Sequence, residues 1–223
     1  MTFDNESHGD VTVLRWRDGE NRFHRTSIDA WHAALDEIDA VTGPAALVVV
    51  GDGKFFSNGL DLDWMSANPD DAGAMVVDVQ RLFGRLLLQG CFTVAAINGH
   101  AFAAGAMLTC GFDQRIMRGD RGYWCLPEVD LGLPLTPAMH AIVAARLPRV
   151  TTHEAMMTGR RYAAVDALER GIVDHVTDEA SVLTEAIEAA AAMAAKDRRV
   201  IAEHKRLIYG DAAAICGWVA AKA

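Results

Sequence analysis

The 223-residue sequence predicts one α/β domain in which strands dominate the first part and helices the last. Two continuous apolar segments, residues 45–50 and 93–97, have the length and composition of buried strands. Each is followed by a loop of small residues and then by a helical pattern. The expected organisation is a single domain over 1–223, with a strand-bearing core at 1–176 and a helical C-terminal region at 177–223.

The first elements alternate between strand and helix. Residues 11–16 alternate in polarity like a half-buried strand, and Asp18-Gly19 supplies a turn. Residues 26–42 place apolar side chains on one helical face, with Thr26 as the expected N-cap. Gly43-Pro44 ends this helix.

The later elements follow the same signals. Residues 69–89 predict a long amphipathic helix, because apolar side chains recur there at helical spacing. Short strands are expected at 114–118, 123–126 and 172–176, and helices at 103–112, 136–146, 151–158, 163–170 and 184–193.

Composition excludes several classes of protein. A net charge of −9 without a basic cluster argues against a nucleic-acid surface. The longest alanine-rich stretch, 186–195, is too short and too interrupted by charge to span a bilayer. The first residues lack the basic and apolar regions of a secretory signal, and the four cysteines are widely spaced without a CxxC pair. We therefore expect a cytoplasmic protein without a membrane span.

Glu128 is the candidate general base. It lies in Leu126-Pro127-Glu128-Val129, and apolar surroundings raise the pKa of a carboxylate towards neutral pH, which suits proton transfer. Taken alone, Glu128 is better explained as an ordinary exposed carboxylate after a proline, because glutamates are mostly exposed. The two small-residue loops favour the functional reading. Asp130, two residues later, is interpreted as a solvated or turn-capping carboxylate.

The loops at residues 55–62 and 98–106 each connect a buried strand to a helix. Backbone N–H groups in such loops can converge on one oxygen and form an oxyanion hole, in which each donor supplies roughly 2.7–4 kcal/mol of transition-state stabilisation. The small residues could instead allow a helix to pack closely on a strand, and Gly59 could simply adopt a positive φ angle in a turn. The same backbone geometry would serve these structural roles and an oxyanion hole. No metal site is expected, because Asp61 and Asp63 have no histidine nearby in the sequence.

Five motifs resemble the enoyl-CoA hydratase/isomerase (crotonase) superfamily. They are FSNGLDL at 56–62, AAINGHAFAAGA at 95–106, DQRIM at 113–117, PEVDLG at 127–132 and GIVD at 171–174. Each motif is weak alone, but their joint order and spacing are specific, and the resemblance runs from about Val11 to Val176.

The resemblance implies a crotonase-like spiral of ββα repeats with a helical C-terminal trimerisation region. It also implies an acyl-CoA thioester as substrate, no separate cofactor, and a homotrimer or hexamer. The N–H groups of Leu60 and Ala104 are implied as oxyanion donors, with Glu128 as the catalytic acid and base. Substrate contacts are expected from Ser57, Asn58, Gly59, Asp61, Leu62, Ala103, Met107, Pro127 and Leu133.

The resemblance is greatest to plant-type Δ3,Δ2-enoyl-CoA isomerases of fatty acid β-oxidation. Hydratases of the family use a second glutamate, and Met107 stands at that position here. A lone Glu128 favours isomerisation through a dienolate. The alternatives are another crotonase-type reaction, such as hydration or thioester hydrolysis, and a catalytically weak acyl-CoA-binding subunit. Asp63 stands where many crotonases have a lysine, so the candidates for contact with the CoA phosphates are Arg22, Arg25 and Lys54.

Overall fold

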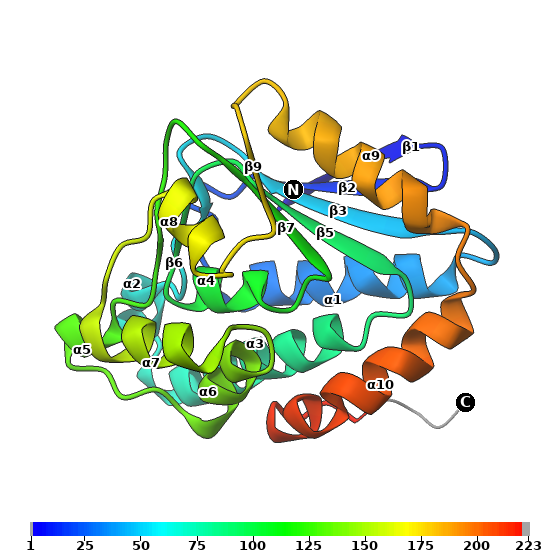
Figure 1. The fold of residues 1–223 in the computed structure, drawn as a ribbon. Helices are drawn as coiled ribbons and strands as arrows, with labels where there is room; N and C mark the ends of the chain where they lie inside the picture. The colour runs from blue at the N-terminus through cyan, green and yellow to red at the C-terminus, as the bar shows by residue number, and fades with distance from the viewer. Residues whose placement is uncertain (1, 220–223) are drawn as a thin grey trace.

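A six-stranded sheet with the order β1-β2-β3-β5-β7-β9 forms the centre of the molecule (Figure 1). The computed structural model describes residues 2–219. Strands β1 and β2 are antiparallel, and the other neighbouring strands are parallel. Their bounds are β1 Phe3–His8, β2 Val11–Trp16, β3 Ala46–Gly51, β5 Phe92–Ile97, β7 Gln114–Arg118 and β9 His175–Thr177.

A second, parallel sheet has the order β4-β6-β8. Each of its strands follows a strand of the large sheet along the chain and precedes a short helix. The strands are β4 Phe55–Ser57, β6 His100–Phe102 and β8 Trp124–Cys125, and the helices are α2 Leu62–Ala67, α4 Ala104–Thr109 and α5 Glu128–Leu131. This succession of strand, strand and helix confirms the expected α/β fold of ββα repeats.

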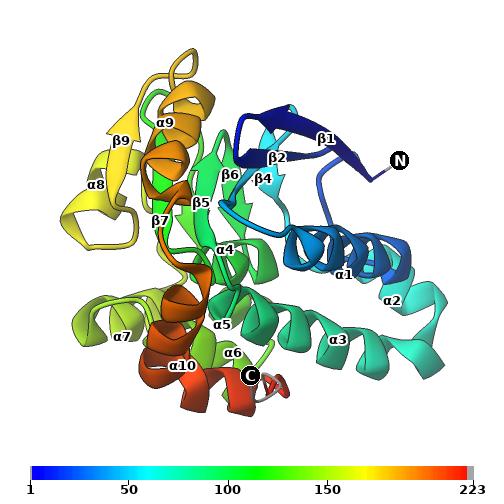
Figure 2. The same cartoon turned by 90° about the vertical axis from the view of Figure 1, so that its right-hand side faces the viewer.

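Helices cover both faces of the large sheet. Helix α9 (Val182–Ala194) lies across one face, and α1 (Arg25–Ala40) and α3 (Pro69–Leu87) lie on the other (Figures 1 and 2). Val48 belongs to the cluster under α9, whereas its neighbour Val49 belongs to the main core. Because alternate side chains are buried on opposite faces, these strands are apolar throughout.

Three of the remaining helices, α6 Pro137–Ala144, α7 Arg149–Thr158 and α10 Arg198–Ile215, lie below the sheets in the view of Figure 1. The fourth, α8 Ala164–Glu169, lies beside β9 (Figure 2). Helix α10 contacts α3 and α6 (Figure 2). A side chain at Gly84 would lie 2.9 Å from the backbone oxygen of Ala213, so this glycine permits the close approach of α3 and α10.

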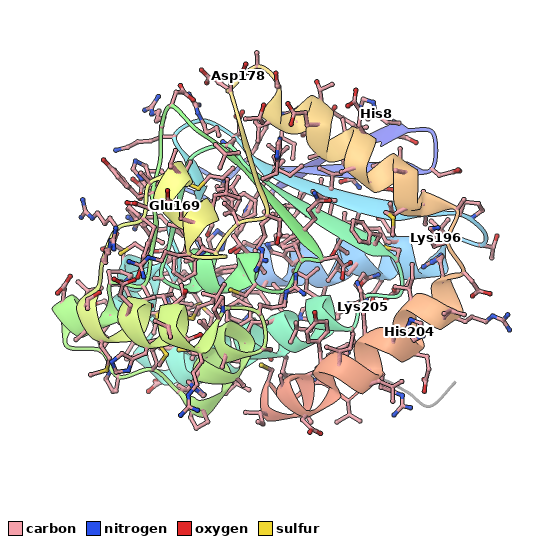
Figure 3. All side chains as sticks on the ribbon, viewed as in Figure 1. His8, Glu169, Asp178, Lys196, His204 and Lys205 are labelled. Atoms are coloured by element: carbon pink, nitrogen blue, oxygen red, sulfur yellow. The ribbon has the colours of Figure 1, made fainter. Side chains whose placement is uncertain are left out.

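A buried ion pair ties α10 to the core. Lys205, labelled in Figure 3, is almost fully buried, and its Nζ lies 2.6 Å from Asp113 Oδ2 and donates to the carbonyl of Cys91 at 2.9 Å. Asp113 also accepts from the backbone N–H of Thr93 at 2.8 Å. Removal of one partner of such a pair leaves a buried charge and is strongly destabilising.

Six elements of the structure were not predicted from the sequence patterns: β1, β4, β6, α2, α5 and α10. Strand β1 buries only Phe3 and is held by backbone pairing to β2. Helix α2 is short and contains no buried residue, and α10 buries only Lys205 and Ala213. The predicted N-cap of α1, Thr26, is wrong. His24 is the cap, and it shares a capping box with Ser27, whose Oγ accepts from the His24 N–H at 2.9 Å.

Candidate active site

The two small-residue loops meet at Gly59. Its φ angle is +82°, and a Cβ there would lie 2.9 Å from the Cβ of Ala103 and 3.2 Å from the backbone nitrogen of Ala104. A larger residue would therefore separate the loops and strain the backbone. This glycine brings the backbone of residues 59–60 against the start of α4.

Each loop contains a backbone N–H of interest, that of Leu60 or of Ala104, for which no protein acceptor is found among residues 2–219. Phe23 donates to the carbonyl of Gly59 at 2.8 Å and accepts from Asp61 at 2.9 Å, which leaves the intervening Leu60 N–H unused. Ala104 is the first residue of α4, so its N–H has no partner within the helix. Ala103 precedes it at φ 51°, ψ −126°, a conformation rarely adopted by residues other than glycine.

A buried polar network supports the first loop from below. Ser57 Oγ donates to the carbonyl of Asn21 at 2.6 Å and accepts from the Gly59 N–H at 3.3 Å. The side-chain amide of Asn21 donates to the carbonyls of Phe55 and Phe56 at 3.1 and 3.2 Å. Asn21 is fully buried and has φ 54°. Asn21 could not be identified from the sequence, because nothing next to an isolated asparagine indicates that it will bond to residues far along the chain.

Glu128 begins α5, after Pro127 at the cap position. Burial raises the pKa of its carboxyl, and a hydrogen bond from its own backbone N–H offsets this only in part. Its Oε2 is buried and has no hydrogen-bond partner within the described chain. A carboxylate with a desolvated, unpartnered oxygen is suited to accept a proton from a substrate.

Glu128 and both loop amides line one pocket of about 500 Å³. Its walls come from the first loop, from the start of α4 and from helices α2, α3, α5 and α6. Most of the lining is apolar. The side chains are Arg22, Asn58, Leu60, Leu62, Asp63, Met65, Val76, Phe102, Ala103, Ala104, Pro127, Glu128, Leu131, Leu133, Pro134, Thr136 and Met139.

The pocket brings together eight of the residues that the sequence predicted. These are Asn58, Leu60, Leu62, Ala103, Ala104, Pro127, Glu128 and Leu133. The other four predicted residues do not line it. Ser57 and Gly59 are buried within the first loop. Asp61 caps α2 by accepting from the Trp64 N–H at 3.1 Å, and Met107 is fully buried in the core. These four support the site through packing and backbone geometry.

The one other carboxylate that lines the pocket lies at its solvent-exposed rim. Asp63 is 94% exposed and accepts from Arg22 at 3.2 Å. Arg22 is also bound to Glu20 at 2.7 Å. Glu128 is therefore the partly buried carboxylate of the pocket, with its Oε2 shielded from solvent. Among residues 2–219 no group of three or more potential ligands is placed to hold a metal ion.

The three cations considered for the CoA phosphates occupy different environments. Arg22 lines the pocket, whereas Arg25 forms an ion pair with Asp78 at 2.6 Å. Lys54 is exposed and lies over the ring of Phe55. Arg22 is the candidate that the pocket places next to a substrate.

The four cysteines are buried and free of disulfides. Burial raises the pKa of Cys125, which is close to Glu128 in sequence, to about 11. A thiol with a raised pKa is a poor nucleophile, so Glu128 is the candidate reactive group of this segment. Within the described part of the chain no helix is both long and apolar enough to cross a membrane.

The chain is similar to known proteins in family profile, in sequence and in structure. The profile of the enoyl-CoA hydratase/isomerase family matches residues 8–212. The chain is 32% identical to peroxisomal enoyl-CoA delta isomerase 2 of Arabidopsis thaliana, over 95% of this chain and 94% of the relative. It is 26% identical to an enoyl-CoA hydratase of Mycobacterium tuberculosis, over 77% and 64% of the two chains.

A solved structure agrees in fold. A family protein from Pseudomonas syringae superposes with a TM-score of 0.91 at 22% identity, covering 97% of this chain and 94% of that one. Sequence profile, sequence relatives and fold therefore agree, and the chain belongs to the enoyl-CoA hydratase/isomerase family.

Proposed function

We propose that this protein is a Δ3,Δ2-enoyl-CoA isomerase of fatty acid oxidation that needs no cofactor beyond the CoA of its substrate. The observation that carries the proposal is a single partly buried carboxylate whose Oε2 is buried and has no hydrogen-bond partner within the described chain. Glu128 lines the pocket and has an unpartnered oxygen. The position expected to carry the second glutamate of a hydratase is Met107, which lies in the core and cannot titrate. One group that removes and returns a proton suffices for isomerisation.

The reaction begins with proton abstraction. The Glu128 carboxylate takes a proton from C2 of the 3-enoyl thioester, and the electron pair of the broken C–H bond delocalises into the thioester carbonyl and the C3–C4 double bond. The resulting dienolate oxygen accepts hydrogen bonds from the N–H groups of Leu60 and Ala104. These amides need no rearrangement, because neither is engaged by another described residue.

The second half returns the proton. The Glu128 carboxylic acid donates it to C4, the double bond forms between C2 and C3, and Glu128 returns to its carboxylate form. No water enters the product. The apolar lining from α2, α3 and α6 supports this course, because an apolar wall binds an acyl chain and excludes water from the dienolate.

Hydration remains the competing reaction, because the chain also resembles hydratases. The purified protein is incubated with a short and a long 3-enoyl-CoA and with the corresponding 2-enoyl-CoA esters, and products are followed by absorbance and mass. Isomerisation leaves the mass of a 3-enoyl ester unchanged and creates the conjugated absorbance. Water addition to the 2-enoyl ester as the main reaction would contradict the proposal, as would release of free CoA. Binding of every ester without turnover would indicate an acyl-CoA-binding subunit.

We also propose a cytoplasmic homotrimer or hexamer. Helices α7, α8 and α10 carry exposed apolar side chains, including Val150, Met157, Val165, Leu207 and Ile208, all more than half exposed in the single chain. Exposed apolar groups of this kind favour association between copies. Sedimentation of the purified protein tests this, and a monomer at micromolar concentration would contradict it.

A further inference from the structure

The two sides of the pocket are joined by one buried tryptophan. Trp124 is fully buried, and its indole Nε1–H donates to the carbonyl of Ala106 at 3.2 Å and to Thr109 Oγ1 at 3.0 Å. Both acceptors belong to α4, the helix that begins with Ala104. Trp124 itself begins β8, and Glu128 follows four residues later. The indole therefore bonds the helix that carries one proposed oxyanion donor to the strand that precedes the proposed base.

Helix α4 needs this bond because it is short. The helix ends at Thr109, and the N–H of Cys110, which would bond to Ala106 in a longer helix, donates to Met107 at 3.0 Å. The carbonyl of Ala106 is left to side chains. The Thr109 hydroxyl donates to it at 2.6 Å and the Trp124 indole at 3.2 Å, with the Cys110 thiol a weak third donor at 3.9 Å. Loss of the indole would weaken the anchorage of α4 to β8.

Strand β8 is also tied to the residue before the Ala104 amide. The carbonyl of Cys125 accepts from the N–H of Ala103 at 3.0 Å. Ala103 has φ 51° and ψ −126°, and a residue in such a sparsely populated region persists there only where neighbouring contacts hold it. The contacts of β8 with Ala103 and with α4 therefore help to set the direction of the Ala104 N–H.

The position of Glu128 depends on the same strand. Helix α5, which Glu128 begins, has four residues, no side-chain cap at its start and no buried residue. Apart from its contact with α7, it is anchored through β8. Trp124 pairs with Ala101 of β6 and exchanges two backbone hydrogen bonds of 2.9 Å with Tyr162. The short helix therefore takes its place from a strand that Trp124 holds.

We propose that Trp124 is a positioning residue, which fixes the separation between the Ala104 amide and the Glu128 carboxylate without touching the substrate. Trp124 does not line the pocket. The inference rests on the proposed isomerase function, in which the base must reach C2 while the thioester oxygen occupies the oxyanion hole. A displacement of about 1 Å between such groups costs about 10²-fold in rate. Ester binding depends on the apolar lining and should be much less sensitive.

Trp124→Phe is the direct test, because it removes the indole donor and keeps an aromatic ring. With a 3-enoyl-CoA, kcat should fall by about 10- to 100-fold, whereas KM should stay within about twofold of the wild-type value. Trp31→Phe is the matched control, because Trp31 is also fully buried and its Nε1 has no hydrogen-bond partner among the described residues. Both variants should lower the Tm, since each removes buried volume, but the control should keep kcat within about twofold.

Thr109→Val tests the same contact from α4, and it carries the test if Trp124→Phe does not fold. Valine removes the hydroxyl that accepts from the indole, so kcat should fall by about 3- to 10-fold at unchanged KM. In the double variant the two losses should not add, because both remove the same bond. Thr151→Val is the control, since Thr151 is buried and its hydroxyl donates to the carbonyl of Arg170 at 2.8 Å, away from this contact.

The positioning role would be overturned by an equal fall of kcat in Trp124→Phe and Trp31→Phe, or by a rise of KM at unchanged kcat. Failure of the proposed function looks different, because the wild type would then not isomerise a 3-enoyl-CoA. In that case the affinity for a 3-ketoacyl-CoA, whose enolate places negative charge on the thioester oxygen, replaces the kinetic measurement. This affinity should fall in Trp124→Phe and not in Trp31→Phe. Equal affinities of the two variants would overturn the inference as well.

Discussion

The two sides of the pocket would contribute to the proposed catalysis in different ways. The loop side offers backbone N–H groups, at Leu60 and Ala104, whose positions depend on glycine and on buried neighbours. The helix side offers a single side chain, Glu128, whose reactivity depends on burial. Substitutions should therefore act on the loop side through the backbone and on the helix side through chemistry. Each substitution below tests that difference.

The largest effect is expected for Glu128→Gln. Glutamine fills the same space but cannot take or return a proton, so kcat for a 3-enoyl-CoA should fall by about 10²- to 10⁴-fold. Ester binding should change little. Steady-state kinetics and calorimetry measure the two quantities. Asp130→Asn is the control, because Asp130 is an exposed carboxylate outside the pocket; an equal loss there would remove the distinction between the two residues.

The same substitution should stabilise the fold. Burial raises the pKa of Glu128, so its neutral form is favoured in the folded state, and stability falls as pH rises from the unfolded pKa through the folded pKa. Glutamine removes this cost. Above that window the Tm of Glu128→Gln should exceed that of the wild type, and a lower Tm at neutral pH would contradict the account of a desolvated carboxylate.

Gly59→Val should produce the next largest effect. Valine disfavours φ +82°, and its Cβ would overlap that of Ala103, so the Leu60 amide should move away from the Ala104 amide. Loss of one oxyanion donor costs about 10²- to 10³-fold in kcat. Unlike Glu128→Gln, this variant should also lower the Tm. Unchanged kcat would show that these amides do not hold the dienolate.

Asn21→Gly tests the support beneath the loop. Glycine accepts φ 54° without strain. The change therefore removes three side-chain hydrogen bonds, two donated to the carbonyls of Phe55 and Phe56 and one accepted from the Asp18 N–H at 2.9 Å. A buried acceptor left unsatisfied costs about 1–3 kcal/mol, and the unfolding free energy should fall by about that amount. Urea unfolding measures it. A change below about 0.5 kcal/mol would mean that other donors replace the amide.

Leu60→Ala should have the smallest effect on kcat. The residue changes its side chain but keeps its N–H group, so the oxyanion hole should persist and kcat should stay within about tenfold of the wild type. Because the Leu60 side chain lines the pocket, KM for the ester should rise. A loss of kcat as large as that of Gly59→Val would contradict a purely backbone role.

Much of the difference between the loop side and the helix side of the pocket could be predicted from the sequence. Loops of small residues and a carboxylate among apolar residues are both local patterns. The strands Ala46–Gly51 and Phe92–Ile97 were predictable for the same reason, since burial on both faces leaves a continuous apolar segment in the sequence. Asn21 and the pocket walls from Val76 and Met139 were not predictable. Their roles depend on contacts with segments far along the chain.

Two of the missed elements have a related cause. Strand β1 and helix α2 bury almost no apolar surface, so their sequences lack the periodicity that reports burial. Asp61 and Met107 were predicted to contact substrate because of their positions in motifs. In the structure Asp61 caps α2, and Met107 lies in the core. Motif position identifies a site, whereas side-chain direction depends on tertiary structure.

The central claim is that Glu128 is the only proton carrier of the site, and the pH dependence of kcat/KM tests it most directly. With a 3-enoyl-CoA, the wild type should show one ascending ionisation, at a pH above the ordinary pKa of a glutamate, and then a plateau to about pH 9. Any residual rate of Glu128→Gln should lack this ionisation. A bell-shaped wild-type profile, or an ascending limb retained in Glu128→Gln, would require a second catalytic group and would contradict the account.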